Sequence, residues 1–233
     1  MIDIESRGKS APDRRSVSHH DLSALCEARF ACSIERGGRV PGELTVLGIG
    51  GSLGARSRTA ALLRTALRHC RDHGMRPRLY DLNKHRLPLF EPTAEAGPPA
   101  SAALLLSEVR AADAIVFASP TYHGTVSGAL KNAIDYLQLL ASDDPPWLSG
   151  KSVALMTASS GQGAGMQTIT ALDHACRAMR AVTVPTVVVA TDEDFARTAA
   201  LADDRFTARF ERIVAELRRH AGTVRAEALV DAP

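Results

Sequence analysis

Three short segments combine glycine with hydroxyl side chains where an apolar run gives way to a helical pattern. The first, residues 50–59, reads Gly-Gly-Ser-Leu-Gly-Ala-Arg-Ser-Arg-Thr. Glycine lets the backbone approach a ligand closely, and the amides of a helix N-terminus donate hydrogen bonds to an anion. A glycine-rich turn with a serine helix cap is the alternative. The segment predicts a phosphate-binding loop whose side-chain donors are Ser52, Ser57, Arg58 and Thr59.

The sequence of this loop does not match two common phosphate-binding motifs. A Walker loop ends in Gly-Lys-Ser or Gly-Lys-Thr, and residues 50–59 contain no lysine. The dinucleotide pattern G-x-G-x-x-G, started at Gly48, has Leu53 where its third glycine belongs. A terminal monophosphate takes many donors, so the abundance of hydroxyls suits it better than a pyrophosphate. A dinucleotide in this loop stays open as an alternative.

The other two segments are suited to a flat ring. Residues 119–128 read Ser-Pro-Thr-Tyr-His-Gly-Thr-Val-Ser-Gly and lead into an expected helix. A rigid proline, backbone amides and a tyrosine form an edge against which a heterocycle can lie. Residues 157–165 read Thr-Ala-Ser-Ser-Gly-Gln-Gly-Ala-Gly, and small residues at the start of a helix leave room for a ring. Each segment alone is typical of an ordinary turn.

Apolar runs and helical patterns alternate through the body of the chain, and this alternation places the three segments. Continuous apolar strands are typical of a parallel sheet covered on both faces, so we expect a doubly wound α/β fold. Ligands bind beyond the carboxyl ends of such strands, and the three segments follow the first, third and fourth of them. The expected strands are 44–49, 78–82, 114–118, 153–156 and 184–190, and helices are expected near 60–70, 100–111, 130–140, 166–179 and 206–217.

Charge and hydropathy exclude several classes of partner. The chain has 28 basic and 26 acidic residues among 233, with a net charge of +2 and the signs interspersed. Nothing therefore indicates a nucleic-acid-binding surface. The longest apolar stretches, such as 182–190, reach about half the length of a membrane-spanning helix. Asp3 and Glu5 stand where an export signal has a basic region, so we expect a soluble, cytoplasmic protein with no membrane contact.

The four cysteines carry no metal-binding or disulfide pattern. They form no Cys-x-x-Cys pair and have no histidine at metal-ligand spacing, so we expect neither a zinc site nor a disulfide framework. Two of them fall on the apolar stripes of expected helices and are interpreted as small buried hydrophobes. The four are Cys26, Cys32, Cys70 and Cys176.

The two ends of the chain are weakly patterned. Residues 1–43 are polar, rich in serine and arginine, and end in the turn-forming run Gly-Gly-Arg-Val-Pro-Gly. We expect an N-terminal extension and linker over 1–43, one ligand-binding domain over 44–222 and a C-terminal tail over 223–233.

The three segments together resemble the NAD(P)H-dependent FMN reductase family of flavodoxin-like proteins. The resemblance rests on Gly-Gly-Ser with Ser-Arg-Thr, on Ser-Pro-Thr-Tyr-His-Gly followed by Ser-Gly-Ala-Leu-Lys-Asn-Ala-Ile-Asp, and on Ser-Ser-Gly-Gln-Gly-Ala-Gly. The Ser-Arg-Thr triplet is similar to reductases that supply reduced flavin in sulfonate-monooxygenase systems. The second loop is closer to FMN-bound quinone and azo reductases. The resemblance implies a five-stranded parallel sheet in the order 2-1-3-4-5.

The resemblance also implies FMN as the cofactor and NADPH or NADH as the hydride donor. Hydride passes from C4 of the nicotinamide to N5 of the flavin, so no side chain is expected to be catalytic. The phosphate would be held by Ser52, Ser57, Arg58 and Thr59. The isoalloxazine ring would lie against Pro120, Thr121, Tyr122, His123 and Gly124 on one side and Ser159, Ser160 and Gly161 on the other.

Three positions depart from the pattern of the family. His123 stands where many relatives have asparagine, Ser127 where many have proline, and Gly54 where some have arginine. The unperturbed pKa of histidine lies near neutrality. We nevertheless interpret His123 as a contact to the flavin or the backbone, because the cofactor itself carries the hydride.

The partners implied are small molecules and a second copy of the chain. Free flavin, a quinone or another small acceptor would take the electrons, and a flavin-dependent monooxygenase would be a further partner. FMN near a subunit interface implies a homodimer or homotetramer. An FMN-binding electron carrier or redox-sensing protein is the alternative, although such carriers are usually strongly acidic. The final acceptor, the preferred nicotinamide, and whether FMN stays bound are left open.

Overall fold

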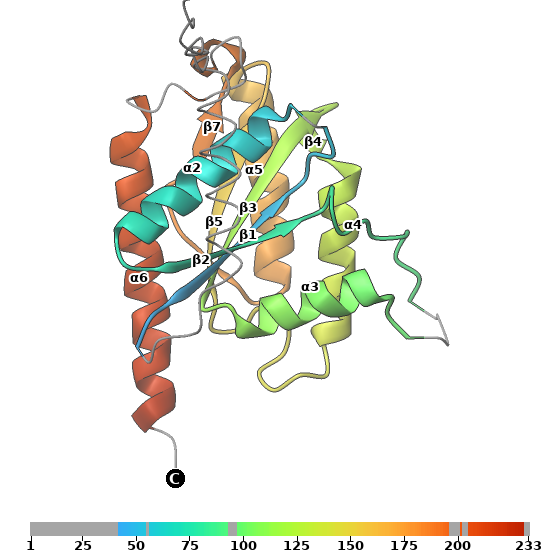
Figure 1. Cartoon of the computed structure of the whole chain (residues 1–233), viewed down its shortest axis with the longest axis vertical. Helices are drawn as coiled ribbons and strands as arrows, with labels where there is room; N and C mark the ends of the chain where they lie inside the picture. The colour runs from blue at the N-terminus through green and yellow to red at the C-terminus, as the bar shows by residue number, and fades with distance from the viewer. Residues whose placement is uncertain (1–41, 55, 93–96, 196–200, 202–204, 231–233) are drawn as a thin grey trace, which may run out of the picture. The chain divides into compact units, whose positions relative to one another are not determined.

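A computed structural model describes residues 42–54, 56–92, 97–195, 201 and 205–230, with side chains described up to residue 221. Within these residues strands and helices alternate (Figure 1). All but the last two residues of the expected N-terminal extension lie outside the described part. In chain order the elements are β1 (Thr45–Gly50), α2 (Arg58–Asp72), β2 (Arg76–Asp81), α3 (Ala100–Ala111), β3 (Ala114–Tyr122), β4 (Thr125–Val126), α4 (Gly128–Tyr136), η1 (Leu137–Leu140), β5 (Ser152–Ala158), α5 (Gln162–Ala178), β6 (Val182–Thr183), β7 (Val188–Ala190), η2 (Asp192–Asp194) and α6 (Thr207–Val230).

The described strands form one sheet in the order β2-β1-β3-β5-β6, with β7 also paired to β5. All of these pairings are parallel, and only the short β4 runs antiparallel, beside β3. The doubly wound α/β class is therefore confirmed. The order of the parallel strands also agrees with the expected 2-1-3-4-5, because β6 and β7 together occupy the place of the fifth strand.

The fifth strand is divided, and this departs from the continuous strand expected over 184–190. β6 pairs with the beginning of β5, whereas β7 pairs with its carboxyl end. Pro185 lies between them and has no N–H to donate to a neighbouring strand. The N–H of Thr186 donates instead to Oε2 of Glu216 in α6, at 3.0 Å. A proline and a side-chain acceptor therefore interrupt the ladder.

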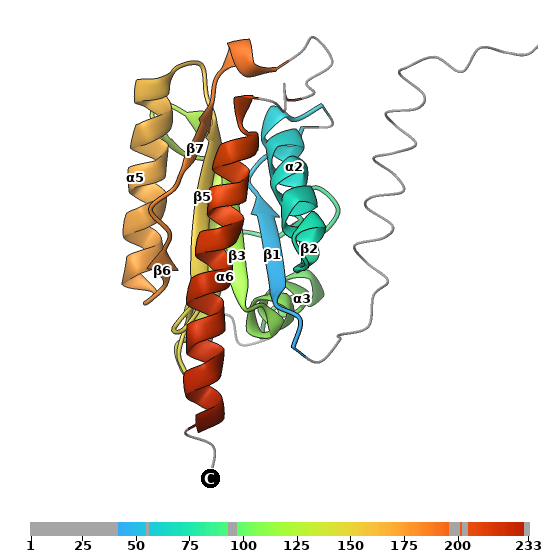
Figure 2. The same ribbon diagram turned by 90° about the vertical axis from the view of Figure 1, so that its left-hand side faces the viewer.

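Helices cover both faces of the sheet. Leu47 and Phe117 belong to a buried cluster with apolar side chains of α3, α4 and α5. The other face meets α2, which also packs on α6. Gly48 allows the close approach of α2, because a Cβ at this position would lie 2.8 Å from Cδ1 of Leu67. Figure 2 shows α5 on one side of the strands and α2 on the other.

The register of the parallel strands brings the three candidate loops to one edge of the sheet. Gly50 at the end of β1 pairs with Ala118 of β3. Two residues further along, Pro120 pairs with Ala158 at the end of β5. The loops after β1, β3 and β5 therefore leave the sheet side by side at its carboxyl edge, as the sequence predicts.

The last helix, α6, is 24 residues long and ends at Val230. It continues past residue 222, where we expect the C-terminal tail to begin. Among the helices that the structure describes, none has both the length and the apolar character needed to cross a bilayer.

The two cysteines in the described part are both buried. Burial raises the pKa of Cys70 and of Cys176 to about 12, so both thiols are protonated at neutral pH. They pack as small hydrophobes, in agreement with the interpretation of the sequence.

Candidate ligand-binding site

Gly51, the first residue after β1, connects the first loop to β3 and α4. Its N–H donates to the carbonyl of Ala118 at 2.8 Å, and its carbonyl accepts from Oγ of Ser127 at 2.7 Å. A Cβ on Gly51 would lie 2.4 Å from that Oγ and 2.7 Å from Cβ of Leu130. Glycine at this position is therefore explained by close packing against the start of α4.

The hydroxyl groups of the first loop differ in accessibility. Ser57 is the N-cap of α2, and its Oγ accepts from the N–H of Ala60 at 3.1 Å. A hydroxyl that accepts one hydrogen bond still donates its own proton, so this cap remains a donor for a ligand. Ser52 is partly exposed, whereas the side chain of Thr59 is buried at 2% exposure. Ser52 and Ser57 thus remain accessible hydroxyl donors, and Thr59 packs into the fold.

Arg58, the first residue of α2, forms an ion pair across the site. Its guanidinium donates to Oδ1 of Asp192, which follows β7. The guanidinium carbon also lies 5.7 Å from the ring centroid of Phe195, within cation–π distance. The positive end of the α2 dipole and the Arg58 charge therefore lie together at the carboxyl edge of the sheet.

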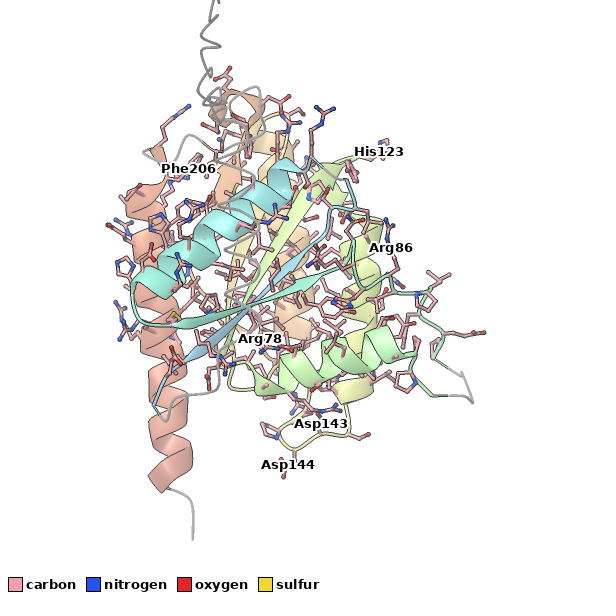
Figure 3. All side chains as sticks on the ribbon, in the orientation of Figure 1. Arg78, Arg86, His123, Asp143, Asp144 and Phe206 are labelled. Atoms are coloured by element: carbon pink, nitrogen blue, oxygen red, sulfur yellow. The ribbon has the colours of Figure 1, made fainter. Side chains whose placement is uncertain are left out.

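The second loop is a tight β-hairpin, which the sequence analysis did not foresee. Thr121 pairs with Val126 and Tyr122 with Thr125, so two residues form the turn. His123 has φ +51° and Gly124 has φ +78°. Positive φ at both positions is typical of a type I′ turn. Figure 3 shows His123 at the tip of this hairpin, pointing away from the fold.

Backbone conformation accounts for the histidine at position 123. Asparagine and histidine both tolerate the left-handed region better than most residues do. Histidine at position 123 is therefore compatible with the turn.

A group of three threonine hydroxyls fixes the base of the hairpin. Oγ1 of Thr121 lies 2.9 Å from Oγ1 of Thr157 in β5 and 2.8 Å from Oγ1 of Thr168 in α5. Pro120 is buried, whereas Tyr122 is 56% exposed. The buried proline and the hydroxyl group anchor an edge from which Tyr122 projects into solvent.

The third loop has one buried and one exposed serine. The N–H of Ser159 donates to the carbonyl of Ala190 at 2.9 Å, and its Oγ donates to the carbonyl of Gly161 at 2.8 Å. Ser160 is exposed. Ser159 therefore shapes the loop, and Ser160 is the side chain available to a ligand.

Glycines keep open space at the starts of α4 and α5. A Cβ on Gly128, Gly161 or Gly163 would meet no atom within 4 Å apart from chain neighbours and the backbone of its own helix. Gly161 also leaves the first turn of α5 without a side-chain cap. This space and these helix amides lie beside the hairpin, where the sequence analysis places a flat ring.

Two serines that were not candidate ligand contacts connect the first and second loops. The N–H of Ser127 donates to Oγ of Ser119 at 3.0 Å. Oγ of Ser127 caps α4 by accepting from the N–H of Leu130 at 3.3 Å. The preference for serine at a helix N-cap was the available signal. A proline here would provide neither the N–H nor the hydroxyl.

A pocket of about 310 Å³ adjoins the first loop, between Leu53 and the start of α4. Asn132 of α4 lines this pocket. It also fixes residues 88–90, because its Oδ1 accepts from the N–H of Phe90 and its Nδ2 donates to the carbonyl of Pro88, both at 2.8 Å. This role of Asn132 is not predictable from the sequence, since no short-range pattern joins it to residues 88–90.

The sequence profile of the NADPH-dependent FMN reductases matches residues 44–196. The chain belongs to this family. The match contains all three loops and confirms the resemblance that their residues indicate.

Individual relatives agree with this assignment. An NAD(P)H-dependent FMN reductase of Pseudomonas aeruginosa is 38% identical over 122 residues, which are 52% of this chain and 62% of the relative. The chain therefore spans less than two thirds of that relative's length. An FMN-dependent NADPH-azoreductase of Staphylococcus aureus is 29% identical over 153 residues, covering 63% of this chain and 77% of the relative.

A solved structure confirms the fold. The flavoenzyme NAD(P)H:(acceptor) oxidoreductase FerB of Paracoccus denitrificans matches with a TM-score of 0.63 at 20% identity. The match covers 77% of this chain and 98% of that one.

The described residues fit FMN. A phosphate requires donors and positive charge, which Ser52, Ser57 and Arg58 supply at the N-terminus of a 15-residue helix. A ring requires open space, which the uncrowded glycines of α4 and α5 leave beside the hairpin.

Proposed function

We propose that the protein is an NAD(P)H-dependent FMN reductase that passes electrons on to a small acceptor. The observation that carries the proposal is the meeting of the three loops at one sheet edge, with Arg58 at the start of α2. When bound, FMN supplies a ring that accepts a hydride from C4 of the nicotinamide at its N5.

In this proposal the side chains bind and orient the flavin. Ser52, Ser57 and Arg58 hold the phosphate, together with the backbone amides at the start of α2, and Thr59 supports them from the buried side. The hairpin of residues 120–124 provides one wall for the ring, and residues 159–161 provide the other. No side chain acts as an acid or a base on the flavin. All of these residues fall within the proposed domain over 44–222.

The names of the relatives define which acceptors to test. One relative is named an azoreductase and another an NAD(P)H:(acceptor) oxidoreductase, so an azo dye, a quinone and free FMN are suitable candidates. Oxidation of NADPH and NADH is followed with each acceptor in turn. The proposal requires turnover that depends on added or bound FMN. No acceleration by any acceptor with either nicotinamide contradicts it.

We also propose that the protein acts in the cytoplasm as a homodimer or homotetramer, with a flavin-dependent monooxygenase as a further partner. The family resemblance implies FMN near a subunit interface. Leu89, at 86% exposure, lines a pocket of about 350 Å³ beside Tyr136, and such an apolar surface favours burial by a second copy. Light scattering with FMN present should give twice or four times the mass of the chain. A strictly monomeric mass contradicts the assembly.

A further inference from the structure

The cation assigned to the FMN phosphate is already paired with a carboxylate of the same chain. The Arg58 guanidinium donates to Oδ1 of Asp192. Both side chains are accessible, with 44% of Arg58 and 57% of Asp192 exposed. An anion that enters from solvent therefore reaches the same guanidinium that Asp192 contacts.

The segment that carries Asp192 is fixed by other contacts. Oδ2 of Asp194 accepts from the N–H and the hydroxyl of Thr191, at 2.7 and 3.0 Å. The Asp194 side chain is 3% exposed, and its Oδ1 lies 2.7 Å from the guanidinium of Arg205. These contacts hold residues 191–194 without Asp192. An exposed ion pair also contributes little to stability, so folding alone does not explain the pairing of Asp192 with Arg58.

We propose that Asp192 determines the affinity for phosphorylated flavin by competing with the phosphate for Arg58. This inference rests on the proposed function, in which Arg58 binds the phosphate. Phosphate binding must either displace the Asp192 carboxylate or place a dianion beside it. Both weaken the binding of FMN relative to a site without Asp192. A flavin without the phosphate has no such competitor. Asp192 thereby favours FMN that exchanges with solution over FMN that stays bound.

An orienting role for Asp192 predicts the opposite result. If the Asp192 carboxylate oriented the guanidinium towards the phosphate, removal of that carboxylate would weaken the binding of FMN. The direction of the change in affinity therefore decides between competition and orientation.

The test is a titration of FMN and of riboflavin into wild type, Asp192→Asn and Glu193→Gln, followed by quenching of flavin fluorescence. Glu193 is the matched control, because it is exposed and carries the same charge one residue further along. Asp192→Asn should bind FMN roughly threefold to tenfold more tightly than wild type, with riboflavin affinity unchanged. Glu193→Gln should stay within about twofold of wild type, because its charge is not paired with Arg58.

A second background separates competition from a general charge effect. In Arg58→Ala, the substitution Asp192→Asn should give a much smaller gain, since the carboxylate then has no guanidinium to occupy. Unchanged or weaker FMN binding by Asp192→Asn overturns the inference, as does an equal gain in both backgrounds. If wild type binds neither flavin, the proposed function itself fails. If wild type binds FMN but Asp192→Asn does not bind it more tightly, only the role of Asp192 fails.

Discussion

At the scale of single residues, the assignment of the phosphate site depends on Arg58. It is the first residue of α2, next to the cap Ser57, so its charge adds to that of the helix dipole. Its contact with Asp192 shows that the guanidinium reaches towards the loop after β7. A ligand phosphate between α2 and this loop would lie within the same region.

Arg58→Ala should lower the affinity for FMN by roughly tenfold to a hundredfold, because a charge-assisted hydrogen bond contributes about 1.5–3 kcal/mol. Riboflavin has the same ring without the phosphate, so its affinity should hardly change. Titrating both flavins and following fluorescence quenching gives the comparison.

Two further variants calibrate this result. Ser57→Ala should show the same selectivity with a smaller loss. Arg71→Ala removes an exposed arginine at the opposite end of α2 and should leave the affinities for FMN and riboflavin unchanged. Equal losses for FMN and riboflavin in Arg58→Ala would mean that Arg58 contacts the ring or supports the fold.

The second prediction at this scale concerns His123, whose backbone has φ +51°. Asparagine tolerates this conformation, whereas valine does not, so His123→Val should destabilise the protein by about 1–2 kcal/mol and His123→Asn should be nearly neutral. Denaturant unfolding measures both. His123→Asn should also keep the pH profile of flavin reduction, and a changed profile in that variant would contradict a purely structural role for this residue.

At the scale of elements, Ser127 joins the first loop to α4. It caps α4 and donates to the carbonyl of Gly51, so one hydroxyl holds two elements of the site. Ser127→Ala should cost about 1–2 kcal/mol of unfolding free energy, measured in urea. The exposed Ser160 provides the control, and Ser160→Ala should change stability little. A Ser127→Ala protein as stable as wild type would show that the cap and the link contribute nothing.

The long elements were predictable because their patterns are local. The apolar runs of β1, β3 and β5 predict a parallel sheet. The three loops follow these strands, so they are expected at the carboxyl edge of the sheet. The hairpin was not predicted, since β4 has only two residues and no alternating pattern. The interruption of the last strand depends on Pro185 together with Glu216, a side chain from a different element.

Contacts between distant residues could not be predicted from the sequence. Arg58 and Asp192 are 134 positions apart, and neither pattern nor spacing joins them. Thr121, Thr157 and Thr168 likewise come from three elements. Residue types and spacing indicated which loops bind the ligand, whereas only the folded chain shows which side chains hold those loops in place.

At the scale of the whole molecule, the parallel sheet brings the three loops together at one edge, although they are far apart in the sequence. The described domain places a cation and hydroxyl donors at one helix N-terminus, and an anchored hairpin with open glycines beside it. Neither part alone distinguishes a flavin site from a turn. Their meeting at one edge, in a chain of the FMN reductase family, supports the binding and reduction of FMN.

The most direct test is reduction of the flavin by a nicotinamide without oxygen. FMN is added to the purified protein under anaerobic conditions, NADPH or NADH is mixed in, and the visible absorbance of the flavin is followed. We expect at least one nicotinamide to bleach the flavin, at one equivalent per FMN and much faster than it bleaches free FMN without protein. A bound flavin that stays oxidised with both nicotinamides, yet is bleached by dithionite, would contradict the account and indicate an electron carrier.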